Sequence, residues 1–284
     1  MTDWTLDFGG VVVRGVADED PLTLPRGFFP GADRDLLARA AALDPAACDL
    51  AADAVLLRVQ VFVVEAFGRT VLVDAGIGDG KERPARPSWH RRRTDFLARL
   101  GVVPAAVEAV ILTHLHVDHV GWATQTLQGR HVPTFPHARH IVAEAEFAHW
   151  QARHDSGEHV SHGAFADSVL PLEEAGLLDR VPSDHAPLPG LRLRPLPGHT
   201  PGQVGVLIEG THMTALITAD AVHHPMQVLR PSLVSSVCTD PARAVTTRQA
   251  LLGDAADGLT LMPCHARGAP LWRVRRDGDA YALA

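Results

Sequence analysis

The chain has 284 residues, of which 46% are hydrophobic and 21% are charged, and its formal net charge is −7. These proportions are those of a globular protein and exclude a disordered or collagen-like chain. The net negative charge, without a long basic run, predicts no positively charged surface for a nucleic-acid backbone. No apolar stretch approaches the roughly 20 residues that span a bilayer, and the first residues do not resemble a signal peptide. We therefore expect a cytoplasmic protein that binds neither nucleic acid nor membrane.

The first part of the chain predicts short strands separated by polar or glycine-rich loops. Apolar and β-branched runs predict strands at residues 11–13, 55–67, 69–74 and 107–112. Residues 17–50 are rich in Asp, Pro and Ala, which predicts an N-terminal extension or insertion with helical character. The glycine-rich segment 74–80 lacks the full nucleotide-binding fingerprint, and the prolines after it cannot easily open a helix, so we expect a loop. Helical spacing predicts a helix at residues 94–100.

The second part repeats this alternation of strands, loops and helices. Ile141 and Val142 predict a short strand that runs into a helix through Trp150, and residues 154–176 predict an irregular or helical wall on the substrate side. Strands are predicted at residues 191–195, 204–208, 213–218 and 259–263. A helix is predicted at residues 240–252, with Asp240 as its N-cap and Pro241 at its first position. Two successive halves of mixed strands and helices fit a four-layer sandwich, and a chain of this length can form one domain.

The strongest chemical signal lies directly after the apolar run at residues 107–112. Four residues of ligand type, His114, His116, Asp118 and His119, fall within six positions. Residues two apart in an extended segment point the same way, so the first two histidines can present their imidazoles to one ion. Asp118 and His119 begin the next helix, where successive side chains are about 100° apart, and they can address a second ion. Imidazole and carboxylate suit zinc and its neighbours, and two such ions that share a hydroxide perform hydrolysis.

This motif resembles the signature of the metallo-β-lactamase superfamily, His-x-His-x-Asp-His followed by a distant His, Asp and His. The later residues match in the same order: His199 lies within a proline- and glycine-rich turn, Asp220 ends a strand, and His265 follows the last predicted strand. The resemblance covers about residues 55–270. It implies a four-layer αββα sandwich of the α/β (α+β) class, as a single domain over residues 1–284 with the extension at about 17–50.

The resemblance also implies a ligand set for two divalent metal ions, of which zinc is the most typical. The ligands divide between the two ions and a bridge: His114, His116 and His199 for the first ion, Asp118, His119 and His265 for the second, and Asp220 between them. Asp74 matches the family's first motif, whose carboxylate usually orients the site from behind the ligands. A simple turn aspartate is the alternative for Asp74.

Two ions around a bridging hydroxide predict a hydrolase. Such ions lower the pKa of water towards ~7 and polarise a carbonyl or phosphoryl oxygen of the substrate. Asp118 can orient the nucleophile and later carry a proton to the leaving group, which makes it a catalytic candidate. Diiron redox members of the superfamily replace the second motif histidine by glutamate, so His116 favours hydrolysis.

The segment after Asp220 bears on the substrate. It resembles the branch that contains N-acyl homoserine lactonases and methyl parathion hydrolase-like phosphotriesterases. Many of those lactonases carry a tyrosine three residues after the bridging aspartate, where this chain has His223, the second catalytic candidate. Either His223 or, in a rotated turn, His224 can donate a hydrogen bond to the developing oxyanion. We expect a small-molecule lactone or carboxylic ester as substrate.

Other functions stay open at this point. Phosphotriester, thioester (as in glyoxalase II) and β-lactam hydrolysis are the alternative reactions, and a metal-binding protein without catalysis is the alternative of another class. A homodimer through residues 17–50 is compatible with the sequence. The three cysteines are too scattered for a disulfide framework or a Cys-x-x-Cys zinc site. Seven more histidines fit no ligand template and receive no role: His131, His137, His140, His149, His154, His159 and His162.

Overall fold

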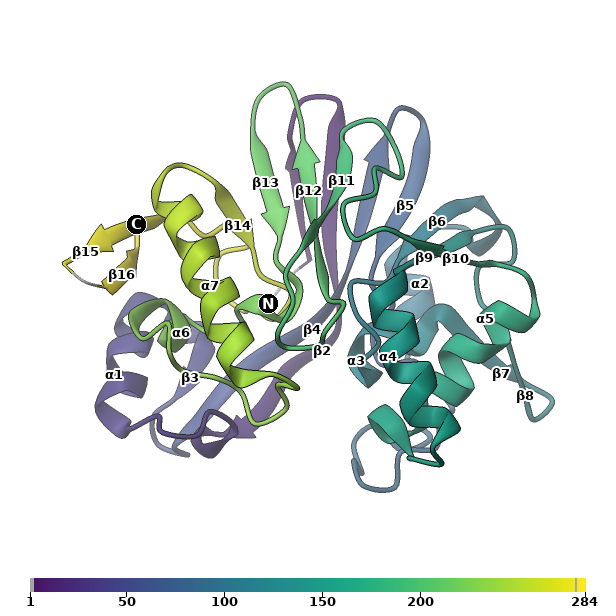
Figure 1. The fold of residues 1–284 in the computed structure, drawn as a ribbon, viewed down its shortest axis with the longest axis horizontal. Helices are drawn as coiled ribbons and strands as arrows, with labels where there is room; N and C mark the ends of the chain where they lie inside the picture. Colours follow the sequence, from purple (N-terminus) through teal and green to yellow (C-terminus); the bar gives the residue numbers. More distant parts are fainter. Residues whose placement is uncertain (1–2, 279) are drawn as a thin grey trace. The chain divides into compact units, whose positions relative to one another are not determined.

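The strands predicted from apolar runs are present, and they fall into two parts of the chain. The computed structural model describes residues 3–278 and 280–284. By their contacts the residues divide into unit 1, which comprises Glu19–Val59 and Ala186–Ala284, and unit 2, which comprises Asp3–Asp18 and Gln60–His185. Figure 1 follows the chain from purple at the N-terminus to yellow at the C-terminus. Both units combine strands with helices, so the mixed α/β class predicted from the sequence is confirmed.

Unit 2 is built on a sheet with the strand order β1-β2-β4-β5-β6-β9-β10. These strands are β1 Trp4–Asp7, β2 Val11–Pro25, β4 Ala54–Ala66, β5 Arg69–Val73, β6 Val107–Ile111, β9 Arg139–Ala143 and β10 Leu178–Val181. The long strands β2 and β4 continue into unit 1, where the short β3, Cys48–Asp49, pairs with β4. The pairs β5–β6, β6–β9 and β9–β10 are all parallel. Residues that follow β5, β6 and β9 therefore meet at one edge of the sheet.

The helices of unit 2 connect these strands. They are α2 Phe96–Leu100, α3 Val117–Val120, α4 Glu144–Asp155 and α5 Leu170–Glu174, and a separate hairpin joins β7 Thr124–Leu127 to β8 Arg130–Pro133. In α4 the buried residues Glu146, Phe147 and Trp150 share one face at helical spacing. The segment predicted as irregular or helical holds a 3-10 turn at Val160–Gly163, a π-helical turn at Phe165–Val169 and then α5.

Unit 1 contains a four-stranded sheet covered by one long helix. Its strands, in spatial order, are β11 Leu191–Pro195, β12 Val204–Glu209, β13 Thr214–Ile217 and β14 Thr260–Met262. The helix α7, Pro241–Ala256, begins as predicted, because the Asp240 side chain accepts a hydrogen bond from the Arg243 amide. Leu251 and Leu252 of α7 pack with Leu216 and Leu261 of the sheet, and Figure 1 shows α7 beside β14. The hairpin of β15 Val274–Asp277 and β16 Ala280–Leu283 follows.

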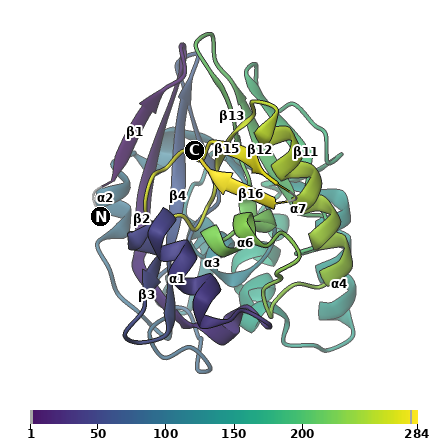
Figure 2. The same cartoon turned by 90° about the vertical axis from the view of Figure 1, so that its left-hand side faces the viewer.

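The N-terminal extension is shorter than the sequence predicted. Strand β2 continues to Pro25, so irregular chain begins only after it, and helix α1 spans Arg34–Leu43. Figure 2 shows α1 beside α6, Pro225–Leu229. Leu36 and Leu37 of α1 share an apolar cluster with Met226 of α6. The extension therefore packs against the helix that directly follows His223 and His224.

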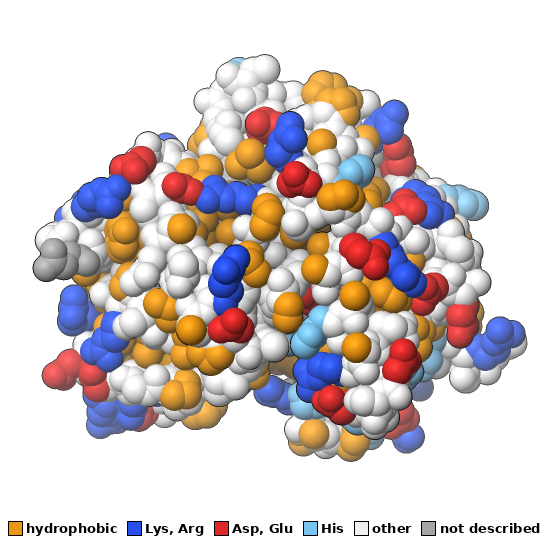
Figure 3. Space-filling view, in the orientation of Figure 1, with side chains coloured by type: hydrophobic (Ala, Val, Ile, Leu, Met, Phe, Trp, Pro, Cys, Tyr) orange, Lys and Arg blue, Asp and Glu red, His pale blue; other side chains and the backbone are white. Residues whose placement is uncertain are grey.

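The surface shows no segregation of charge on the face that Figure 3 presents, where acidic and basic side chains are intermixed. Among the described residues, no helix combines the length and the hydropathy that crossing a membrane would require.

Candidate metal centre

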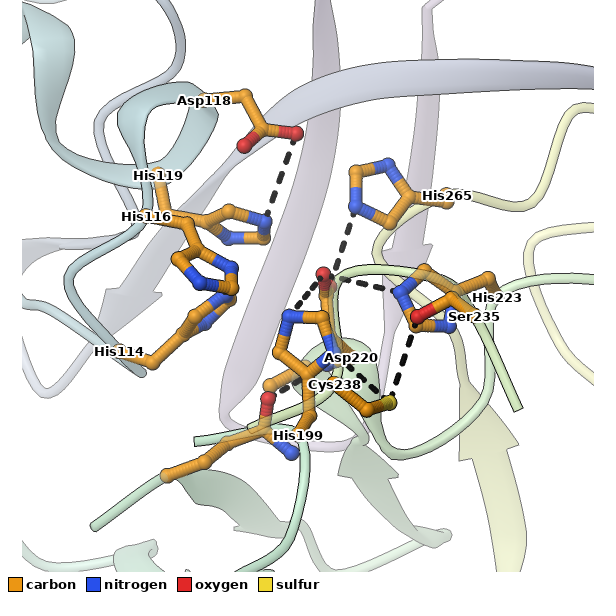
Figure 4. A network of polar contacts seen from close by, with 12 residues as sticks. His114, His116, Asp118, His119, His199, Asp220, His223, Ser235, Cys238 and His265 are labelled. Atoms are coloured by element: carbon orange, nitrogen blue, oxygen red, sulfur yellow. Dashed lines mark hydrogen bonds and ion pairs between the residues drawn. The ribbon is translucent and has the colours of Figure 1, made fainter. Parts of the chain in front are cut away.

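Four of the predicted ligands lie together in unit 2, and we call His114, His116, Asp118 and His119 the first half-site. They follow β6, and His116 is the N-cap residue of the short helix α3, which carries Asp118 and His119. The Nε2 atom of His114 lies 3.1 Å from Nδ1 of His116, and the rings of His114 and His119 are 4.1 Å apart. Figure 4 shows the four side chains side by side. The local spacing thus brings all four together.

Asp74 holds this half-site from behind. It directly follows β5 with a φ of 62°, a left-handed conformation that aspartate tolerates better than most residues. Its carboxylate accepts hydrogen bonds from the Thr113 amide at 2.9 Å and from His119 Nδ1 at 2.8 Å. Because a carboxylate only accepts, His119 carries a proton on Nδ1, and a neutral ring then has its lone pair on Nε2, which lies 3.8 Å from Asp118 Oδ2. Asp74 therefore orients His119 and is not only a turn residue.

In unit 1, three histidines surround one carboxylate, and we call His199, Asp220, His223 and His265 the second half-site. The Nε2 atoms of His199, His223 and His265 lie 3.2, 3.1 and 3.1 Å from the oxygens of Asp220. Asp220 lies in the 3-10 turn Ala219–Ala221 after β13 and is 4% exposed. Figure 4 shows the rings converging on it. The two later histidine ligands and the bridging aspartate of the sequence prediction are thus neighbours in unit 1.

The turn that carries His199 depends on a glycine. Gly198 has a φ of 135°, and a Cβ atom built on it would lie 2.2 Å from the backbone nitrogen of Ala244 in α7. The turn is bonded to the start of that helix, because the Asp240 amide donates to the Gly198 carbonyl at 2.9 Å and the Thr239 amide donates to the His199 carbonyl at 2.8 Å. The close approach of this turn to α7 therefore fixes the position of His199.

In the second half-site, His265 is oriented in the same way as His119. His265 Nδ1 donates to the carbonyl of Arg58 at 2.7 Å, so a neutral His265 presents its Nε2 lone pair to Asp220 Oδ1. A lone pair that faces an anionic oxygen is unfavourable, so His265 Nε2 either carries a second proton or shares a cation with Asp220. Burial opposes the protonation of His199, but attraction to Asp220 outweighs it and raises the pKa of His199 to about 9. These donors, imidazole nitrogens and a buried carboxylate, fit a divalent ion such as zinc.

The structure distinguishes His223 from His224. His223 lies beside Asp220, its ring stacks on His265 at 5.5 Å, and burial lowers its pKa to about 4 although Asp220 attracts its proton. His224 instead caps α6: its Nδ1 accepts from the Met226 amide at 3.2 Å and its Nε2 donates to the Ala47 carbonyl at 2.9 Å. Both ring nitrogens of His224 have partners within the scaffold, so His223 is the candidate for contact with a substrate.

Three neighbours of the half-sites were not assigned to them from the sequence, although Trp150 was considered as a residue that lines an apolar pocket. Glu146 accepts a hydrogen bond from the Leu115 amide at 3.0 Å, and the Trp150 ring lies 5.4 Å from the His116 ring. Cys238 Sγ lies 3.6 Å from His199 Nδ1. No local spacing marks these residues, because each reaches its histidine through the fold. The helical spacing of Glu146 and Trp150 was the only signal that placed them on one face.

Comparisons with known sequences point to one family. The profile of the metallo-beta-lactamase superfamily matches residues 54–263. A probable metallo-hydrolase of Mycobacterium tuberculosis is 26% identical over 188 residues, which are 60% of this chain and 58% of the relative. An N-acyl homoserine lactonase of a Bacillus species is 30% identical over 131 residues, which are 46% of this chain and 44% of the relative. The chain thus spans 44–58% of the length of these curated relatives.

Solved structures share the fold at low sequence identity. A hydrolase of the beta-lactamase superfamily, AbOPH, aligns with a TM-score of 0.81 and 19% identity, over 99% of this chain and 96% of that one. AidC, a dizinc quorum-quenching lactonase, aligns with a TM-score of 0.79 and 17% identity, again over 99% and 96% of the two chains. These likenesses confirm the predicted fold class, the αββα sandwich of the metallo-β-lactamase type.

Proposed function

Because this chain belongs to the metallo-beta-lactamase superfamily, we propose that it is a dinuclear metal-dependent hydrolase that cleaves a lactone or a carboxylic ester. The observation that carries the proposal is the orientation of two imidazoles. The outer nitrogens of His119 and His265 donate to Asp74 and to the Arg58 carbonyl, so that their inner nitrogens face the carboxylates of Asp118 and Asp220. Such an arrangement suits cations held between the imidazoles and the carboxylates, and its donor types favour zinc.

We infer that the two half-sites act on one pair of ions. The support for this is the order of ligands in the superfamily signature, which the chain matches throughout. The proposed division is His114, His116 and His199 for one ion, Asp118, His119 and His265 for the other, and Asp220 shared. When bound, such ions supply a hydroxide nucleophile near neutral pH and polarise the scissile carbonyl.

The residues of the chain then orient the reactants and move a proton. Asp74 and the Arg58 carbonyl keep the rings of His119 and His265 in one tautomer. The Asp118 side chain is 16% exposed, whereas that of His119 is 2% exposed, so Asp118 can take the proton of the nucleophile and pass it to the leaving group. His223 is neutral because burial lowers its pKa to about 4. The one N–H of this neutral ring lies toward Asp220, whose Oδ2 atom is 3.1 Å from Nε2, and we propose that it is shared with the substrate oxygen that gains negative charge.

Several observations favour a lactone or ester with an apolar group. The rings of Phe28 and Phe29 each lie 6.1 Å from that of His223, and Phe28 is only partly buried, so it can offer apolar surface to an acyl or alkyl chain. The Bacillus relative is an N-acyl homoserine lactonase, and the structural neighbour AidC is a lactonase. His223 stands where many homoserine lactonases carry tyrosine, so the proposal names the ester and lactone class rather than one lactone.

The substrate class is tested by a panel of lactones, aryl esters, thioesters, β-lactams and phosphotriesters. We expect the highest kcat/KM on a lactone or ester, loss of turnover after chelation, and recovery with added zinc, manganese or cobalt. His223→Phe should lower kcat on the best substrate by about 100-fold with metal content unchanged, because it removes a hydrogen-bond donor. Turnover confined to thioesters, lactams or phosphotriesters would reject the ester and lactone class. Two bound ions without turnover on any substrate would favour a non-catalytic metal-binding protein.

A further inference from the structure

Two buried carboxylates flank the loop that carries His114 and His116. Strands β5, β6 and β9 are parallel neighbours in the order β5-β6-β9, so the segments after them lie along one edge of the sheet. Asp74 follows β5 and accepts the Thr113 amide at 2.9 Å. Glu146 lies in the first turn of α4, after β9, and accepts the Leu115 amide at 3.0 Å. The loop after β6 is therefore held from both neighbouring strands, at alternate amides.

Glu146 also reaches His116 through a second side chain. Its Oε1 atom accepts from Trp150 Nε1 at 2.6 Å, which is the i, i+4 pairing expected on one face of a helix. The indole of Trp150 meets the His116 ring edge to face, with centroids 5.4 Å apart and an interplanar angle of 69°. The guanidinium of Arg153 lies 5.2 Å from the Trp150 ring and packs on it. One carboxylate oxygen thus fixes both the backbone beside His116 and the ring that packs on its imidazole.

The two hydrogen bonds that Glu146 accepts lie in a buried environment, which increases their effect on the position of the loop. Glu146 has no exposed surface, and Leu115 and Trp150 are 0% and 3% exposed. Water cannot replace a hydrogen bond at such buried sites, so losing the acceptor would leave the Leu115 amide and the Trp150 indole N–H unpaired. Metal ligands must be held within about 0.5 Å and 10–20° of their working geometry by the residues around them. Asp74 does this for His119, and Glu146 holds the equivalent place on the other side of the loop.

We infer that Glu146 and Trp150 are positioning residues that set the direction of His116 and thereby the metal affinity of the first half-site. The inference rests on the proposed function, because it assigns a role toward an ion that His116 binds. It predicts that the oxygen of Glu146, and not only its bulk, is needed. A bond that merely fastened α4 to the loop would change the stability of the protein but not the affinity of the folded protein for metal.

The test is the affinity of metal-free protein for cobalt, measured by chelator competition, together with the visible absorption spectrum of the cobalt-loaded protein. Glu146→Gln keeps an acceptor oxygen and should change the dissociation constants by less than about threefold. Glu146→Met keeps the length but has no acceptor oxygen, only a weakly accepting sulfur, and it should weaken cobalt binding by about 10–100-fold and shift the spectrum. Glu144→Met, at an exposed position in the same turn of α4, is the matched control and should behave as wild type.

A shorter carboxylic acid at position 146 provides a second test of the positioning role. Glu146→Asp keeps the carboxyl group but is one methylene too short to reach both amide and indole, so it should weaken cobalt binding at least tenfold. It tests the positioning role even if Glu146→Met does not fold. Wild-type cobalt affinity and spectrum in Glu146→Asp, or in folded Glu146→Met, overturns the positioning role even if the unfolding midpoint falls. Wild-type protein that binds no cobalt contradicts the proposed function instead, so the two failures are distinguishable.

Discussion

Replacement of Asp220 by asparagine is expected to lower kcat/KM on the best lactone or ester by about 1000-fold or more, because an interaction worth several kcal/mol is lost from the reacting centre. Asparagine has almost the same shape, but it carries no charge and only one oxygen. The Nε2 atoms of three histidines lie 3.1–3.2 Å from the two carboxylate oxygens, so the loss affects the whole second half-site. Elemental analysis of the same preparation should show that at least one ion per chain is lost.

The matched control is Asp257→Asn, which removes an exposed carboxylate of unit 1 that pairs with Arg276. It should leave turnover and metal content as in wild type, since an exposed ion pair contributes little to stability. Full activity and unchanged metal content in Asp220→Asn would show that Asp220 does not bridge the ions.

The second large effect is expected from Gly198→Ala, which should lower the free energy of unfolding by about 3 kcal/mol or more. The φ of 135° is strained for any residue with a Cβ atom, and that atom would lie 2.2 Å from the Ala244 nitrogen. Backbone cannot move aside as a flexible side chain can, so either the turn or the start of α7 must shift. His199 directly follows, and metal binding should weaken as well. Urea denaturation and chelator competition measure the two effects.

Gly258→Ala distinguishes the effect of backbone strain from that of steric overlap with α7. Gly258 has a φ of 118°, but nothing lies within 4 Å of a Cβ atom built on it. Alanine there should cost only the conformational strain, about 1–2 kcal/mol, and should leave metal affinity unchanged. If the two substitutions had equal effects on stability and on metal binding, contact with α7 would not be what fixes the His199 turn.

The elements that the sequence predicts well are those whose pattern is local. Strands β6, β11 and β12 are short apolar runs, and α7 begins at an aspartate N-cap followed by proline, so their bounds are predicted within one or two residues, apart from the C-terminal end of α7. Strand β2 was predicted only at residues 11–13 because Asp18, Glu19 and Asp20 have low strand propensity. Its neighbours in the sheet extend it to Pro25. Pairing with other strands is a tertiary interaction, and a short stretch of sequence does not reveal it.

The candidate site divides in the same way. His114, His116, Asp118 and His119 are close in sequence and lie together in the structure. His199, Asp220 and His265 were found only through the order of a family signature, and the structure shows them as neighbours in unit 1. The choice between His223 and His224 could not be made from sequence, because it depends on which ring the turn directs towards Asp220. Glu146 and Trp150 resemble any buried pair on a helix until the His116 loop is placed beside them.

The central claim, that the chain holds a pair of catalytic divalent ions, is tested most directly by the metal content per chain of protein purified from metal-supplemented buffer. We predict about two ions per chain, their removal by a chelator together with all lactone or ester turnover, and the return of both when zinc, manganese or cobalt is added. Protein that contains no metal after this treatment, or that turns over its substrate equally well without metal, would contradict the account.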